Sequence, residues 1–137
     1  MLMRMIETGG PIVYQQELND PRGFKVDLND KNKCFAWLRG MRIYISGSMA
    51  NCMDTYKDIF QRKAQQLTDL GAIVVNPATL PIGLADRSYM PICLSMLDGV
   101  DAIFLFNDWE HSKGANLERA YADYQGKIML YEINYRS

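Results

Sequence analysis

The sequence has few of the residues on which several common kinds of functional site depend. It has one histidine, His111, and three widely spaced cysteines, Cys34, Cys52 and Cys93, in 137 residues. A disulfide framework or a zinc cluster is therefore not expected, and a Ser-His-Asp triad has little support. No metal or cofactor is predicted. Unpaired cysteines are typical of a reducing compartment, so a cytoplasmic location is predicted.

The sequence also lacks an excess of charge of one sign and any long apolar run. It contains 15 basic and 16 acidic residues, for a net charge of -1. This balance favours neither a nucleic-acid polymer nor an anionic membrane as a partner. No apolar segment is as long as a membrane span, and the first ten residues, which include Glu7, do not resemble a secretory signal. Hydrophobic residues at 48% and charged residues at 23% are ordinary for a soluble globular protein.

From Met41 onward, short apolar segments alternate with helical patterns. Strands are predicted at residues 42–45, 72–75, 101–106 and 127–131. The helices between them are predicted to face the sheet with Tyr56, Phe60, Ala64 and Leu67, then with Met90, Cys93, Leu94 and Leu97, and finally with Leu117, Ala120, Tyr121 and Tyr124. This alternation predicts an α/β fold: a three-layer, flavodoxin- or Rossmann-like parallel sheet of four to five strands, in the order 2-1-3-4, with helices on both faces.

Residues 1–40 have a different pattern. The turn-forming segment 19–23 separates apolar residues 12–14 from residues 24–26, which predicts a β-hairpin. We therefore predict an N-terminal extension over residues 1–40 and an α/β domain over residues 41–137. The extension could be an added arm, an oligomerisation element or an extended gene start, and the sequence does not choose among these.

Glu118 is the candidate catalytic residue. It lies on the helix that follows the third predicted strand, outside the predicted sheet-facing stripe, and its neighbours three and four positions away are mostly small. A solvated surface glutamate is the simpler interpretation. However, the strand order 2-1-3-4 brings the loops after strands one and three, residues 46–51 and 107–112, to one crevice at the carboxyl ends of the strands. This arrangement favours a functional role for Glu118.

Several other residues of these segments are candidates for ligand binding. Backbone N–H groups of the Ser46-Gly47-Ser48 turn could hold a phosphate or sugar, although a tight turn alone also explains the glycine. The segment Ser112-Lys113-Gly114 suits an anion, because it begins a helix capped by Ser112.

Apolar and aromatic candidates surround the same crevice. Trp109 could stack on a base or sugar, cover the end of the sheet or make a subunit contact. Met49 and Tyr89 are predicted to form apolar walls, whereas Cys93 is interpreted first as a small core residue of its helix.

Three segments together resemble the nucleoside deoxyribosyltransferase superfamily. They are IYISGSMAN, the helix before VDAIFLF, and DWEHSKGANLERAYADYQGK. The greatest resemblance is to a small bacterial and phage branch, carried as a domain of unknown function, with the pattern W-E-x-S-x-G-A-x-x-E. The resemblance covers residues 41–132 and leaves residues 1–40 outside it.

The resemblance implies cleavage or transfer of the N-glycosidic bond of a nucleoside or nucleotide. Glu118 matches the nucleophile, which would form a glycosyl-enzyme that water or a second base resolves. Ser112 and the loop of Gly47 and Ser48 match positions that hold a 5′-phosphate in nucleotide-hydrolysing relatives. Cys93 stands where the enzymes have an assisting aspartate, and this departure puts activation of the leaving base in doubt. The superfamily also implies a homo-oligomer.

These observations leave three hypotheses. The first is an N-glycosyltransferase or N-glycoside hydrolase that uses Glu118. The second is a non-catalytic module that binds or senses a nucleotide-like ligand in the same crevice. The third is an interaction protein in which the crevice is vestigial and the N-terminal extension makes the contacts.

Overall fold

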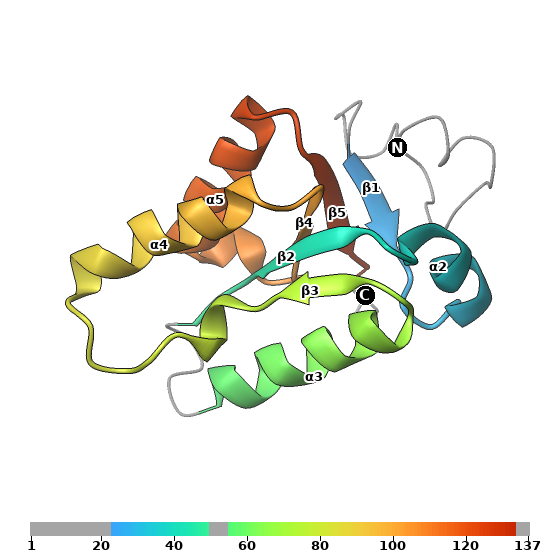
Figure 1. Ribbon diagram of the computed structural model, residues 1–137, viewed down its shortest axis with the longest axis horizontal. Helices are drawn as coiled ribbons and strands as arrows, with labels where there is room; N and C mark the ends of the chain where they lie inside the picture. The colour runs from blue at the N-terminus through green and yellow to red at the C-terminus, as the bar shows by residue number, and fades with distance from the viewer. Residues whose placement is uncertain (1–22, 50–54, 134–137) are drawn as a thin grey trace.

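The centre of the protein is a five-stranded parallel sheet (Figure 1). The computed structural model describes residues 23–49 and 55–133. The strands are β1 (Gly23–Val26), β2 (Arg42–Ser46), β3 (Ile73–Val75), β4 (Ala102–Leu105) and β5 (Ile128–Glu132). Their order is β1-β5-β4-β2-β3, and every neighbouring pair is parallel. The order predicted for the four strands after Met41 is confirmed, and β1 adds a fifth strand beside β5.

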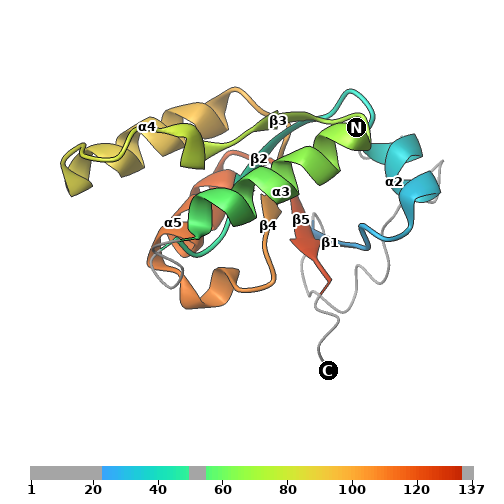
Figure 2. The same ribbon diagram turned by 90° about the horizontal axis from the view of Figure 1, so that it is seen from below.

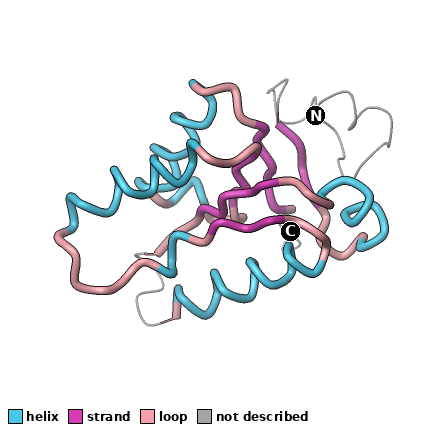
Figure 3. Tube along the Cα trace, viewed as in Figure 1, coloured by secondary structure: helices cyan, strands magenta, loops and turns pink. Residues whose placement is uncertain are grey.

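Helices connect the strands and cover both faces of the sheet, as Figure 3 shows along the chain. They are α2 (Lys31–Leu38), α3 (Tyr56–Asp69), α4 (Asp86–Asp98) and α5 (Lys113–Tyr124), with two 3₁₀ helices, η3 (Pro77–Thr79) and η4 (Trp109–His111). The N-cap residue of α3 is Thr55. Asn51 and Asp54 have side chains of the kind that caps a helix, but both lie outside the described residues.

The two faces of the sheet carry two separate hydrophobic cores. One core joins α2 and α3 to the face that presents Ile43, Ile45 and Phe104. The other joins α4 and α5 to the face that presents Tyr44 and Ile103. The side chains of successive strand residues point to opposite faces, so a continuous apolar strand serves both cores at once. Figures 1 and 2 show α2 and α4 at opposite ends of the molecule.

The segment predicted as the second half of a hairpin forms β1, which lies at one edge of the sheet that the described residues make. Phe24 pairs with Leu130 of β5 in parallel register. Residues 12–14, predicted as its partner strand, lie outside the described residues. Trp37 and Leu38 of α2 are buried in the same core as α3. The division at Met41 stays a prediction about domain organisation, while in three dimensions β1 and α2 belong to the sheet and core of the α/β domain.

Two strand-end contacts fix the central strands relative to their neighbours. Arg42, at the start of β2, donates from Nη2 and Nε to the carboxylate of Asp101, at 3.0 and 3.2 Å. Glu132, at the end of β5, forms an ion pair with Lys63 of α3 and accepts the N–H of Asn107 after β4 at 3.1 Å. The starts of β2 and β4, and the ends of β4 and β5, are therefore held together. Within the described segments, every helix is too short or too polar to span a membrane.

Candidate active site

The carboxyl ends of β2 and β4 form the floor of the site. The two strands pair in register up to Ser46 and Leu105, and the N–H of Phe106 donates to the carbonyl of Ser46 at 2.9 Å. In the sheet, β2 has β3 on one side and β4 on the other. The connections that follow β2 and β4 therefore leave the sheet in different directions and separate here. An open crevice at this position is the usual ligand site of doubly wound sheets.

Gly47 lies directly against Phe106 at this floor. A Cβ atom built on Gly47 would lie 2.3 Å from Cδ2 and 2.7 Å from Cγ of the Phe106 ring. Both distances are far below van der Waals contact, so the position requires glycine for close packing. Packing against Phe106 is therefore a sufficient reason for the glycine, and ligand binding is not needed to explain it.

Gly47→Ala is expected to destabilise the protein by about 1–3 kcal/mol, because the buried Phe106 ring must move to admit the methyl group. Urea denaturation measures the change. Gly114→Ala is the matched control, since its nearest atom would be Cε of Met90 at 3.5 Å, an ordinary contact. Equal stability of Gly47→Ala and the wild type would show that the packing against Phe106 is not tight.

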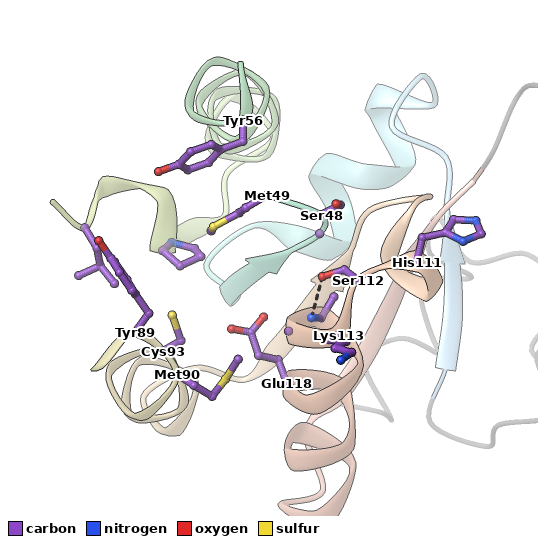
Figure 4. A pocket seen from close by; sticks show the side chains of 15 residues that line it. Ser48, Met49, Tyr56, Tyr89, Met90, Cys93, His111, Ser112, Lys113 and Glu118 are labelled. Atoms are coloured by element: carbon purple, nitrogen blue, oxygen red, sulfur yellow. Dashed lines mark hydrogen bonds between the residues drawn. The ribbon is translucent and has the colours of Figure 1, made fainter. Parts of the chain in front are cut away.

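A cavity of about 390 Å³ opens above this floor (Figure 4). This volume lies within the range of small-molecule sites. Its lining residues are Gly47, Ser48, Met49, Tyr56, Pro77, Leu80, Tyr89, Met90, Cys93, His111, Ser112, Lys113, Gly114, Ala115 and Glu118. Figure 4 shows the carboxylate of Glu118 pointing into a space bordered by Met49, Tyr89 and Cys93.

The start of α5 is fixed by several side-chain hydrogen bonds. Ser112 is the N-cap residue, and its Oγ accepts the N–H of Ala115 at 3.1 Å. The side-chain amide of Asn116 donates to the carbonyls of Trp109, Glu110 and Ser112, at 3.3, 3.1 and 2.8 Å. These bonds tie η4 to α5 and set the helix rotation that carries Glu118 inward.

The face of α5 that packs on the sheet differs from the predicted one. Its buried residues are Ala115, Glu118 and Ala122, whereas Leu117 is 49% and Tyr124 is 88% exposed. The prediction for Leu117, Ala120 and Tyr124 is wrong, and of that stripe Tyr121 alone packs partly against the core. The physical reason is that alanine allows the helix to approach the sheet closely, while Glu118 finds polar partners there.

Two buried hydroxyl groups on β2 hold the carboxylate of Glu118. The hydroxyl of Tyr44 donates to Oε2 at 2.5 Å, and Oγ of Ser46 donates to Oε1 at 2.7 Å. Residues i and i+2 of a strand lie on one face, so both donors point toward α5. Tyr44, Ser46 and Glu118 are all at most 7% exposed. The carboxylate is therefore positioned rigidly, and each oxygen keeps a lone pair for another contact.

The pKa of Glu118 is raised, because burial disfavours the charged form. Hydrogen bonds from Tyr44, Ser46 and Cys93 oppose this rise. The pKa of Cys93 is also raised, first by burial and further by the charge of Glu118, although hydrogen bonding with Tyr44 lowers it. The pKa of Tyr44 is raised by burial and then by the charge of Glu118. At neutral pH, Tyr44 and Cys93 thus remain protonated beside the carboxyl group.

Residues 41–131 match the family model described as a domain of unknown function, DUF4406. The chain belongs to the DUF4406 family. Among curated proteins, none matches the sequence. Of solved structures, the DUF4406 chain is similar to a 2-desoxiribosyltransferase from Leishmania mexicana, with a TM-score of 0.56 and 19% identity. The similarity covers 69% of this chain and 65% of that protein, and it shows a shared fold.

Most of the predicted site residues of this DUF4406 protein come together in the cavity. These are Gly47, Ser48, Met49, Tyr89, Cys93, Ser112 and Gly114, which line it together with Glu118. Ser46, also predicted to contact the ligand, does not line the cavity, and its Oγ donates to the carboxylate of Glu118. The backbone N–H of Ser48 donates to Asp108 at 3.2 Å, which joins the two loops that flank the crevice.

Trp109 does not line the cavity. Its ring lies 5.8 Å from the ring of Tyr131, and the guanidinium of Arg119 lies over it at 5.2 Å. Stacking of Trp109 on a ligand therefore stays a prediction that this cavity does not support. Its alternative, that Trp109 covers the end of the sheet, agrees with the contact to β5.

Several residues of the site were not predicted. Tyr44 is the most consequential, because it makes the shortest hydrogen bond to Glu118. Its position two residues before Ser46 was a usable signal, once Glu118 is placed on the inner face of α5. Tyr56 and Leu80 line the cavity, although Tyr56 was predicted to face the sheet and no role was predicted for Leu80.

Ionisation of Glu118 is expected to make stability depend on pH. The pKa of Glu118 is higher in the folded state than in the unfolded state, where it is near 4.5. The stability that the protonated group contributes is therefore fully present below pH 4.5 and is lost as pH rises through the folded-state pKa. Glu118→Gln has no titrating group at this position. Urea denaturation between pH 4 and 9 should therefore show Glu118→Gln gaining stability relative to the wild type as pH rises. A difference that is constant, or that shrinks with rising pH, would contradict the raised pKa.

Proposed function

We propose that the protein cleaves or transfers the N-glycosidic bond of a nucleoside or nucleotide, with Glu118 as the nucleophile. The observation that carries the proposal is the placement of a buried carboxylate, held by Tyr44 and Ser46, at the floor of a nucleoside-sized cavity. The cavity lies at the sheet position where this class of fold binds ligands. The shared fold with a 2-desoxiribosyltransferase agrees with this chemistry.

The reaction would proceed in two displacements. An oxygen of Glu118 bonds to the anomeric carbon while the carbon–nitrogen bond breaks, and the bonding pair leaves with the base. Water or a second base then attacks the same carbon and releases the carboxylate. The hydroxyls of Tyr44 and Ser46 keep the carboxylate oriented through both steps, which contributes positioning rather than proton transfer.

A 5′-phosphate would bind at the start of α5. Ser112, Lys113 and Gly114 line this side of the cavity, where the helix N-terminus and the lysine both favour an anion. The loop after β2 is less suitable, because the N–H of Ser48 already donates to Asp108. We therefore assign the phosphate to the α5 side of the cavity.

A second candidate function is non-catalytic binding of a nucleotide-like ligand in the same cavity. Cys93 favours it, because a buried thiol with a raised pKa is a poor proton donor to a leaving base. Under this alternative, Glu118 would contribute to ligand affinity but no base would be released.

The test is incubation of the purified protein with a panel of nucleosides and 5′-nucleotides, followed by chromatography for free base. Release of base by the wild type is the expected result, and addition of an acceptor base distinguishes transfer from hydrolysis. Thermal stabilisation by a panel member that is never cleaved would instead support the binding module.

A further inference from the structure

The carboxylate of Glu118 is buried without a charged partner in the described part of the chain. Its hydrogen-bond donors are the neutral hydroxyl groups of Tyr44 and Ser46 and the neutral thiol of Cys93. None of the ion pairs between described residues involves Glu118. A buried charge that has only neutral partners is costly, and a cation placed beside it would recover part of that cost. The floor of the cavity thus favours a ligand with positive charge.

The walls of the cavity are of a kind that accommodates a planar cation. Tyr56 and Tyr89 supply aromatic rings, and Met49 and Met90 supply thioether sulfurs. Aromatic faces attract cations, and sulfur is polarisable. The Tyr56 ring already has such a contact within the protein, since Nζ of Lys57 lies 5.6 Å from its centroid. Lys57 itself is held by the carbonyl oxygens of Ala78 and Leu80 and does not line the cavity.

With Lys113 assigned to a 5′-phosphate, the other groups around the cavity offer little help to a base that needs a proton in order to leave. Among its described lining residues, Glu118 has the one carboxyl group, and that group is needed as the nucleophile. The hydroxyl of Tyr89 donates to the carbonyl of Pro81 at 2.6 Å and accepts the N–H of Leu84 at 3.3 Å. In Figure 4 the imidazole of His111 points away from Glu118. A base that leaves as a neutral molecule requires none of these groups.

We infer that the cavity selects N-glycosides whose base carries a positive charge, such as pyridinium or N7-alkylated purinium rings. The binding part of this inference stands on the cavity, and its reaction rests on the proposed function. Glu118 forms a carbon–oxygen bond to the anomeric carbon as the carbon–nitrogen bond breaks. The electron pair of the broken bond stays on the ring nitrogen and neutralises the departing ring. Water then attacks that carbon, its proton passes to solvent, and the carboxylate is restored.

Binding is tested at pH 8 with two probes that have no glycosidic bond and differ by charge: 1-methylnicotinamide, a cation, and its neutral 1,4-dihydro form. Isothermal titration calorimetry should show the wild type binding the cation about tenfold more tightly, which corresponds to about 1.4 kcal/mol. Glu118→Gln should abolish this preference, and Glu110→Gln, an exposed glutamate outside the cavity, should keep it. Tyr56→Leu, which removes one ring from the wall, should reduce the preference in a protein that retains Glu118.

Equal affinity of the wild type for both probes would overturn the inference, as would a cation preference that survives in Glu118→Gln. Turnover separates this inference from the proposed function. Guanosine and N7-methylguanosine are compared, each rate being divided by that of the uncatalysed reaction. A larger enhancement for N7-methylguanosine supports the inference, while equal or greater enhancement for guanosine overturns it and leaves the proposed function standing. If Glu118→Gln loses the cation preference and the wild type releases no base from any substrate, cation recognition is supported and the proposed function is refuted.

Discussion

Glu118→Gln is expected to lower base release by about a thousandfold or more, because it removes the atom that bonds to the anomeric carbon. The glutamine side chain has the same shape, and the hydroxyls of Tyr44 and Ser46 can rotate to accept from its amide as well as donate to its oxygen. The fold and the cavity should therefore persist. Steady-state assays of free base, with thermal unfolding of the same preparation, measure both effects.

Glu110→Gln is the matched control for this variant. Glu110 is exposed, lies eight positions earlier in the same segment and does not line the cavity, so its substitution should leave base release unchanged. Base release by Glu118→Gln at the wild-type rate would remove Glu118 from the reaction. Equal loss in both variants would indicate a general effect of charge near α5 rather than loss of a nucleophile.

Phe60→Ala is expected to cost about 3–5 kcal/mol of unfolding free energy, the largest stability effect that we predict. The side chain is fully buried in α3, 4.7 Å from the ring of Phe106 and 6.4 Å from that of Tyr56. Its removal leaves a cavity beneath the ring that packs on Gly47. A domain has a total stability of about 5–15 kcal/mol, so the loss is a large fraction of the whole. Urea denaturation with a fixed m-value measures it.

The control for this prediction is Tyr124→Ala, which truncates a side chain that is 88% exposed. Its effect should stay within about 0.5 kcal/mol. A Phe60→Ala cost below about 1 kcal/mol would show that α3 and the floor of the site are not packed as described. Because Phe60 also supports Tyr56, a wall of the cavity, weaker ligand binding should accompany the loss of stability.

The sheet was predictable from sequence because its physical signals are local and mutually consistent. The β4 segment is apolar without alternation, as a strand covered on both faces must be, and the structure buries all four of its residues. Parallel strands joined by helices allow few strand orders. The predicted order, which the structure has, brings Gly47 and Glu118 to one crevice.

The rotation of α5 was not predictable by the same reasoning. Hydrophobic periodicity favoured the stripe of Leu117 and Tyr124, but packing distance and hydrogen bonding decided the outcome. Alanine at positions 115 and 122 permits close approach, and the donors for Glu118 reside on β2, more than 70 positions away in sequence. Pairing between such distant residues leaves no periodic signal.

The pairing of β1 with β5 was missed for a related reason. Residues 24–26 have the composition of a strand, and the turn formers before them made a hairpin the simplest partner. In the structure their partner is β5, about 100 positions later. A local pattern identifies a strand but does not identify the strand with which it pairs.

Trapping of the glycosyl-enzyme tests the central claim most directly. A 2-deoxy-2-fluoroarabinosyl nucleoside with a good leaving base should form the ester and resolve it slowly, because fluorine destabilises the oxocarbenium-like transition state of the second step. Intact-protein mass spectrometry should show one added fluoroglycosyl group. After digestion with trypsin, the added group should be found on the peptide Gly114–Arg119, and fragmentation of this peptide should locate it on Glu118. Release of base without an adduct on this peptide, or an adduct on Cys93 instead, would contradict nucleophilic catalysis by Glu118.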